Sequence, residues 1–502
     1  MVVRSWMGGR RLRPGRAVFV ATLLFLGVLA SRAPFVSQTL WAHDSVLYAN
    51  AIERGFHVDD DLRDQRPHPP GYILYVATAD VAHAAGLDSN GALVLVSALA
   101  SALAAAALFL FARRWVRDSV AVIVALAFSA DPLVWHYSEI AYPYTVLGLG
   151  SIVVAWCGLA ARGRGLRPAL LASVAFGVAG GFRQDLLLLL LPLWLWCVAP
   201  LGVRRSVHAG LATIGACLVW LVPTIVLSGG PDEYFSALQS QASYVRDAYS
   251  VAAQGLPALV ANLAVTSFAT GWGLLAMTPL AVVAAFGAVR RSVLLRAIDD
   301  RVPLLIWSLP ALSLYVVLHI GDWGYVLSAL PGLYLLGGRT LDALVAVPGR
   351  PRRLALALAA LGLVVLPGYG FAALAGPFSA AIITEHGREL GSRVAYVRAN
   401  YAPRSTMVLT REDFLLVRYY LPEYRTRQYD PEPFTHSSRR MRATRHVERI
   451  VVFTRGLVPD QARDVRRVTC SKGIQLVYLD VMPGAILEFK GERYAVASPP
   501  PY

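Results

Sequence analysis

The chain has 502 residues, of which 56% are hydrophobic and 16% are charged, and its mean hydropathy is +0.51. Soluble domains carry about 25% charged residues, so the composition excludes an ordinary soluble protein as well as fibrous, disordered and small disulfide-rich chains. The net charge of +15 has two possible explanations: a nucleic-acid partner, or an excess of basic residues in the cytoplasmic loops of a membrane protein. The positions of the arginines decide between these two explanations.

Apolar stretches recur along most of the chain. A helix of about 20 apolar residues can cross a bilayer because its backbone polar groups are bonded internally. The first stretch follows several arginines like a signal peptide, but its apolar core is long and ten further stretches follow, so we interpret it as an uncleaved anchor. We predict eleven membrane-spanning helices, at residues 16–36, 91–112, 119–134, 143–161, 168–182, 184–200, 208–228, 261–289, 302–319, 323–338 and 353–375.

The arginines support this count and orient it. With a cytoplasmic N-terminus, the predicted cytoplasmic segments of residues 1–376 hold 21 arginines and four acidic residues, and the other segments hold six arginines and fifteen acidic residues. Cytoplasmic loops of membrane proteins are enriched in Lys and Arg. The pattern therefore predicts a multi-pass protein of the plasma membrane, most simply a bacterial inner membrane. It argues against a nucleic-acid partner, because the basic residues are divided among loops.

Three polar segments face the outer side in this topology. The first covers residues 37–90 and includes a stretch at 72–85 whose apolar face suits a helix lying along the membrane interface. The second, around 135–144, is short, and the third covers about 229–260. Residues that meet a substrate at the outer membrane surface are expected in these segments.

The last part of the chain has a different pattern. Its alternating apolar runs and helical periodicities indicate a small α/β domain on the extracytoplasmic side. We expect strands at 406–409, 449–453 and 475–479, and helices at 385–400, 411–421 and 459–467. The predicted fold class is thus a polytopic α-helical membrane protein, with residues 1–376 forming the transmembrane domain and residues 377–502 forming the α/β domain.

Four short motifs follow one another along the transmembrane domain. They are His-Asp-Ser-Val-Leu-Tyr-Ala at 43–49, His-Pro-Pro-Gly-Tyr at 68–72, Gly-Phe-Arg-Gln-Asp at 181–185, and Asp-Trp-Gly-Tyr-Val-Leu-Ser-Ala-Leu-Pro at 322–331. In their order and predicted sidedness they resemble the GT-C glycosyltransferases, and among these the branch around aminoarabinose transferase and protein O-mannosyltransferase. The resemblance covers about residues 16–376 and implies a GT-C-like fold.

The resemblance also implies an activity. Such enzymes take a sugar from a polyprenyl-phosphate carrier at the outer membrane face and pass it to a hydroxyl of a lipid, glycan or protein, generally with inversion. Two other interpretations stay open: a transporter or flippase of lipid-linked sugar, and a non-catalytic cell-envelope scaffold. The odd number of spans and the absence of repeated halves argue against a transporter.

An acceptor hydroxyl needs a base to take its proton, whereas a phosphate leaving group needs a nearby cation more than an acid. Asp44 follows the first span and is the candidate base, with a loop or helix-capping role as the alternative. Glu139 is the second catalytic candidate, and a solvated loop residue is its alternative. A divalent cation held by Asp44 and Glu139 stays open, because no ligand spacing requires one.

Arg183 is the candidate ligand of the carrier phosphate, because a charged residue between two apolar spans is costly and is usually functional or paired. The alternative is an ion pair with Asp185. His68 is the second phosphate candidate, or else a loop histidine exposed to solvent. The expected substrate-pocket residues are Tyr48, Tyr72, Asp322, Tyr325 and Arg246, although an interfacial aromatic belt also explains Tyr325.

Overall fold

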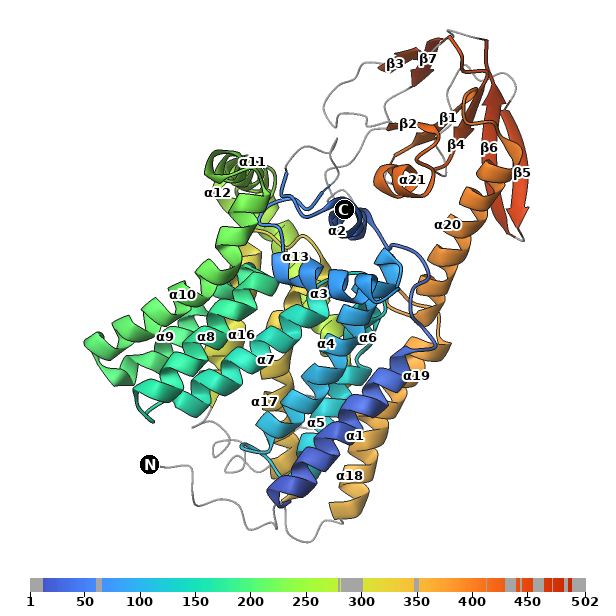
Figure 1. Cartoon of the computed structure of the whole chain (residues 1–502). Helices are drawn as coiled ribbons and strands as arrows, with labels where there is room; N and C mark the ends of the chain where they lie inside the picture. Colours follow the sequence, from blue (N-terminus) through green and yellow to red (C-terminus); the bar gives the residue numbers. More distant parts are fainter. Residues whose placement is uncertain are drawn as a thin grey trace. The chain divides into compact units, whose positions relative to one another are not determined.

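The computed structural model describes residues 12–59, 66–278, 280, 301–346, 352–411, 413–428, 439–442, 445–454, 465–471, 473–482 and 486–489. The chain forms two compact units, which Figure 1 shows in colours that follow the sequence. The first unit comprises Met1–Val36 and Tyr48–Ile383, and the second comprises Ser37–Leu47 and Thr384–Tyr502.

The first unit is helical, because its apolar stretches bury their side chains against one another and satisfy their backbone groups internally. Helix α1 packs on α4, α4 on α7, α7 on α8, and α8 on α10, so these helices form a continuous row (Figure 1). The described elements are α1 Pro14–Arg32, α2 His43–Arg54, α3 Ile73–Ala84, α4 Ser89–Ala112, α5 Asp118–Ala130, α6 Pro132–Ser138, α7 Tyr144–Ala161, α8 Leu166–Phe182, α9 Asp185–Val198, η1 Ala199–Leu201, α10 Val203–Leu227, α11 Pro231–Tyr249, α12 Val251–Gln254, α13 Leu256–Gly273, η2 Leu275–Met277, α16 Arg301–Val317, η3 Trp323–Ser328, α17 Leu330–Val345, α18 Arg352–Ala360, η4 Leu361–Val365 and α19 Leu366–Ala373.

Five helices in the described part are long and apolar enough to cross a membrane: α1, α4, α7, α10 and the continuous run Arg352–Ala373. A sixth is obtained if α5 and α6, which are bent by 63° relative to each other, count as one span. Helices α3, α8, α9 and α16 are apolar but shorter. The structure therefore has helices at the predicted spans but does not establish that eleven helices cross the membrane. Part of the predicted span 261–289 lies outside the described residues.

The predicted span at residues 323–338 is wrong at its N-terminal end. The 3-10 helix η3 occupies Trp323–Ser328, and α17 begins only at Leu330. The side chain of Asp322 caps the short helix by accepting a hydrogen bond from the Gly324 N–H at 3.2 Å. Pro331 then suits the first turn of α17, where a backbone N–H is not needed. The Asp-Trp-Gly-Tyr motif is therefore a folded turn in front of the helix.

Helices α8 and α10 approach unusually closely at Gly177. A β-carbon at this position would lie 2.6 Å from the Ala216 Cβ and 2.7 Å from the Thr213 carbonyl oxygen. The indole N–H of Trp220 on α10 donates to the Gly177 carbonyl oxygen at 2.8 Å. This contact holds the last turns of α8 against α10, directly before the turn that carries Arg183.

The second unit contains α20 Ala380–Asn400, α21 Phe414–Tyr420 and a five-stranded sheet with the strand order β2-β1-β4-β6-β5 (Figure 1). Strand β1 pairs in parallel with β2 and β4, and β6 pairs antiparallel with β4 and β5. Strands β3 and β7 form a separate antiparallel pair. The strand bounds are β1 Thr406–Thr410, β2 Arg425–Gln428, β3 Arg439–Arg442, β4 Arg449–Val452, β5 Val465–Ser471, β6 Ile474–Asp480 and β7 Ile486–Phe489.

The predicted strands at 406–409, 449–453 and 475–479 coincide with β1, β4 and β6, whose apolar residues bury one face of the sheet. The helix predicted at 459–467 is wrong for residues 465–467, which begin β5, and the rest of it lies outside the described residues. Pairing with β6 overrides the local helical pattern there. Gly473, with a φ of 79°, lies in the tight connection between β5 and β6.

Candidate functional site

The turn between α8 and α9 carries a buried ion pair. Arg183 follows the last residue of α8 in an extended conformation, and its side chain is 3% exposed. Its Nε and Nη2 groups donate to the two carboxylate oxygens of Asp185, at 3.2 and 2.8 Å. The predicted alternative for Arg183, pairing with Asp185, is therefore present in the structure. An arginine held by two parallel hydrogen bonds has a defined orientation, so its remaining N–H groups point in a fixed direction.

Three tyrosine rings surround the same guanidinium group. Its central carbon lies 5.1 Å from the ring centroid of Tyr72, 4.8 Å from that of Tyr144 and 4.9 Å from that of Tyr325. These distances are within the range of cation–π attraction. The rings come from the start of α3, the start of α7 and the helix η3. We call Tyr72, Tyr144 and Tyr325 the aromatic cage.

Tyr72 has a strained backbone. Its φ and ψ angles are 50° and 44°, which is the left-handed region that non-glycine residues rarely adopt. Such a conformation costs on the order of 1–2 kcal/mol and persists where the surrounding structure imposes it, often at functional sites. The rings of His68 and Tyr48 meet the Tyr72 ring edge-on, with centroids 6.0 and 5.8 Å away. Three residues that the sequence assigned to phosphate binding or to the substrate pocket therefore lie in contact.

Two tyrosine hydroxyls fix the position of the turn that carries Tyr325. The hydroxyl of Tyr137 on α6 donates to the carboxylate of Asp322, the residue that caps η3. The hydroxyl of Tyr315 on α16 donates to the backbone carbonyl of Tyr325 at 2.9 Å. Asp322, predicted as a pocket residue, thus supports the position of Tyr325 in the cage.

Gly324 lies against Tyr144, so we expect Gly324→Ala to disturb the cage. A β-carbon there would lie 2.4 Å from two ring atoms of Tyr144 and 2.9 Å from its Cβ. Because these atoms are close to the Tyr144 backbone, the ring cannot swing aside cheaply, and overpacking of this kind costs roughly 1–3 kcal/mol. A lowered temperature of thermal unfolding in detergent checks this. Gly271→Ala, where no atom lies within 4 Å of the added carbon, is the control. Equal stability of the two variants would contradict the prediction.

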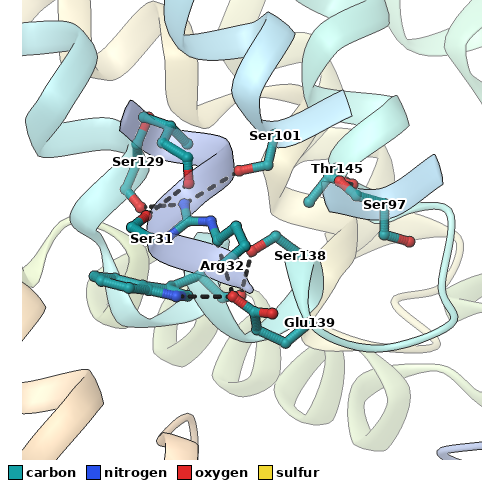
Figure 2. A network of polar contacts seen from close by, with 10 residues as sticks. Ser31, Arg32, Ser97, Ser101, Ser129, Ser138, Glu139 and Thr145 are labelled. Atoms are coloured by element: carbon teal, nitrogen blue, oxygen red, sulfur yellow. Dashed lines mark hydrogen bonds and ion pairs between the residues drawn. The ribbon is translucent and has the colours of Figure 1, made fainter. Parts of the chain in front are cut away.

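Glu139 is fully buried in a second polar network, which Figure 2 shows. The Trp135 indole N–H donates to Glu139 Oε1 at 2.9 Å, and Arg32 Nε lies 4.0 Å from the same oxygen. Arg32 Nη2 also donates to the carbonyl oxygen of Ser129 at 2.6 Å and to Ser101 Oγ at 3.2 Å. The network joins α1, α4, α5 and α6, so Glu139 holds α6, the helix that carries Tyr137.

Asp44 lies in the first turn of α2 and belongs to the second compact unit. It is partly exposed and follows Ala42, whose N–H and carbonyl groups both bond to Ser45 Oγ. Arg246, on α11, is 63% exposed and pairs with Asp247 at 2.7 Å. Arg246 is therefore not one of the residues that surround Arg183.

A family model described as the protein O-mannosyl-transferase TMEM260 N-terminal domain matches residues 64–204, a range that includes Arg183 and its partner Asp185. No curated protein matches the chain in sequence.

Solved structures match over nearly the whole chain. ArnT from Cupriavidus metallidurans bound to undecaprenyl phosphate has a TM-score of 0.56 and 15% identity, over 93% of this chain and 97% of that one. Its apo form has a TM-score of 0.55 and 14% identity, over 92% and 98%. The chain has the GT-C fold. The mycobacterial arabinofuranosyltransferase AftD is similar too, with a TM-score of 0.50 and 13% identity over 95% of this chain, which spans only 40% of AftD. The predicted resemblance to GT-C glycosyltransferases is confirmed.

Two residues around Arg183 escaped prediction. Tyr144 and the supporting Tyr137 emerge only from the structure. The available signal was the density of aromatic residues at 135–144, in a short segment between two apolar stretches. Within the described ranges, no three His, Cys, Asp or Glu side chains come together as a metal site.

His319 lies beside the aromatic cage. A β-carbon on Gly321 would lie 2.9 Å from His319 Nε2 and 3.3 Å from the Tyr325 hydroxyl, so both groups border the same small space. The His319 ring stacks on Tyr249 of the α11 segment, with centroids 4.5 Å apart.

Proposed function

We propose that this GT-C protein is a plasma-membrane glycosyltransferase that moves a sugar from a polyprenyl-phosphate carrier to a hydroxyl of a lipid, glycan or protein. The observation that carries the proposal is the buried Arg183–Asp185 pair inside the aromatic cage, in a chain with the fold of ArnT, which was solved with undecaprenyl phosphate. The arginine distribution supports a cytoplasmic N-terminus and an extracytoplasmic second unit.

In this proposal Arg183 binds the carrier phosphate. Its hydrogen bonds to Asp185 use Nε and Nη2, so the Nη1 edge of the fork is directed at the phosphate. The two contacts to Asp185 fix the direction of this edge, and a preset donor costs no reorganisation when charge develops on the leaving group. We propose Tyr72 and Tyr325, whose rings lie beside the Arg183 guanidinium, and His68, whose ring lies against Tyr72, as further contacts of the carrier.

The reaction is a single displacement. Asp44 takes the proton of the acceptor hydroxyl, whose oxygen forms a bond to C1 of the sugar. The bond from C1 to the carrier phosphate breaks, and its electron pair leaves with the phosphate, which needs no proton because it is a good leaving group. Attack opposite to the leaving group inverts C1. This chemistry requires one carboxylate and one cation, unlike the hydrolysis of ordinary glycosides, in which two carboxylates share the work.

The other predicted residues take supporting roles. We propose that Tyr48 and Asp322 shape the pocket through Tyr72 and Tyr325, which they contact or hold in place. Glu139 contributes by holding α6, and Arg246 contacts the acceptor from the exposed face of α11. A divalent cation at Asp44 and Glu139 remains a prediction, and parallel assays with magnesium and with EDTA decide it.

The decisive experiment uses the full chain in liposomes with radiolabelled polyprenyl-phosphate sugars and a membrane extract as the acceptor source. We expect label in the acceptor fraction with wild type and with Arg205→Ala, an exposed arginine of α10, and far less label with Arg183→Ala. Movement of labelled lipid across the bilayer without transfer would instead establish a flippase. Neither transfer nor movement with any donor would favour a non-catalytic scaffold.

A further inference from the structure

The second compact unit joins two distant pieces of the chain. Ser37–Leu47 belongs to it together with Thr384–Tyr502, although all of Tyr48–Ile383 lies between them in the sequence. The first piece carries Asp44, whereas the reaction proposed above assigns no task to the second. The contacts between these two pieces indicate what that task is.

Leu40 is one point of contact between the two pieces. Its side chain is fully buried, and side chains of two different helices satisfy both polar groups of its backbone. The Leu40 N–H donates to the hydroxyl oxygen of Tyr420 on α21 at 2.9 Å, and the Leu40 carbonyl accepts from Nε2 of His386 on α20 at 3.1 Å. A buried backbone N–H and carbonyl both need partners, and here the C-terminal part of the chain supplies both.

The neighbours of Leu40 strengthen this attachment. The Trp41 ring packs on the imidazole of His386, with centroids 4.6 Å apart. Thr39 Oγ1 lies 3.6 Å from the position of a β-carbon on Gly387, so the segment runs close to the α20 backbone. Burial lowers the pKa of His386, which keeps the ring neutral at pH 7 with one N–H available for the Leu40 carbonyl.

The backbone between Leu40 and Asp44 has little freedom. Ser45 Oγ accepts from the Ala42 N–H at 3.0 Å and donates to the Ala42 carbonyl at 2.6 Å, and Ser45 is fully buried. Asp44 therefore lies inside this closed turn, shortly after the residue that is bonded to α20 and α21. We expect a shift of either attachment to displace its carboxylate.

We propose that His386 and Tyr420 are positioning residues and that the C-terminal part of the chain holds the Asp44 segment in its productive position. This inference rests on the proposed function, since it takes Asp44 as the base. Misplacing a catalytic group by about 1 Å costs on the order of 10²-fold in rate. Loosening the anchor should therefore lower kcat and leave KM for the lipid donor unchanged.

The first test measures the anchor itself, without reference to activity. Hydrogen–deuterium exchange of the peptide covering residues 37–47 is followed by mass spectrometry in wild type, His386→Ala and Tyr420→Phe. Both variants should speed the exchange of this peptide at least about tenfold, because each removes one bond to Leu40. The exposed His446→Ala is the matched control and should exchange like wild type. Unchanged exchange in His386→Ala would overturn the inference.

The second test links the anchor to Asp44 by a double-mutant cycle. His386→Ala should lower kcat about 10- to 100-fold, and His386→Gln, which keeps an N–H donor, should recover part of it. In the Asp44→Asn background, His386→Ala should change the residual rate by less than about twofold, because there is no longer a base to position.

The remaining outcomes separate this inference from the proposed function. Full transfer activity in Asp44→Asn would refute the proposed base, and with it the positioning role, whatever the exchange experiment shows. If Asp44→Asn is inactive but His386→Ala retains wild-type kcat despite faster exchange, only the positioning role fails. A rise in KM for the acceptor alone would make the C-terminal part an acceptor-binding module instead.

Discussion

Replacing Arg183 by alanine is expected to lower kcat/KM for the polyprenyl-phosphate donor by about 10²- to 10³-fold. A buried, charged donor aimed at a developing phosphate charge contributes roughly 3–4 kcal/mol to transition-state stabilisation. The side chain is 3% exposed, so water cannot replace it. Initial rates of sugar transfer in liposomes at several donor concentrations provide the measurement.

The variant Arg183→Lys separates the contribution of the positive charge from that of the hydrogen-bond geometry. Arg183→Lys keeps the positive charge but cannot bond Asp185 through two parallel N–H groups while directing a third at the phosphate. We expect it to lose about 10- to 100-fold in kcat/KM, between the values for wild type and alanine. Arg205→Ala controls for loss of an arginine at an exposed position. If Arg183→Ala unfolds the protein, Arg183→Lys still decides, since wild-type kinetics in that variant would rule out a phosphate ligand.

Asp44→Asn is expected to lower kcat by about 10²- to 10⁴-fold with little change in KM for the donor, because general-base catalysis contributes that much. The substitution removes the charge and the basic oxygen but keeps the shape. The carboxylate is partly exposed, so its loss should leave the fold intact. Single-turnover rates with donor and acceptor premixed are the measurement.

Asp80→Asn is the matched control for this second prediction, because Asp80 is an exposed carboxylate on α3. It should retain the wild-type rate. Wild-type turnover in Asp44→Asn would show that another group accepts the proton. A rise in donor KM at unchanged kcat would show instead that Asp44 binds the sugar.

Local properties of the sequence are sufficient for the membrane class and for the positions of most helices. Hydrophobic length and arginine placement act within one segment at a time, so the apolar stretches coincide with helices even where those helices are short. Arg183 could be recognised for the same reason, since a charge between two apolar stretches is costly wherever the helices pack.

Local sequence properties do not predict the structure where it depends on strand pairing or on which side of a helix faces a distant segment. Strand β5 occupies the last three residues of a predicted helix, 465–467, because these residues pair with β6. The 3-10 helix η3 precedes α17 because Asp322 and Gly324 close a turn first. The sequence also did not predict the burial of Glu139, because its partner Arg32 comes from α1, far away in the sequence.

The sequence by itself therefore determined a multi-helix membrane protein with an arginine in a costly place, because hydrophobicity and charge are properties of each segment. Only the tertiary structure decided that Tyr72, Tyr144 and Tyr325 surround this arginine, and that the segment carrying Asp44 belongs with the C-terminal part. Contacts between distant segments depend on how whole helices rotate and pack, and no short stretch of sequence encodes that.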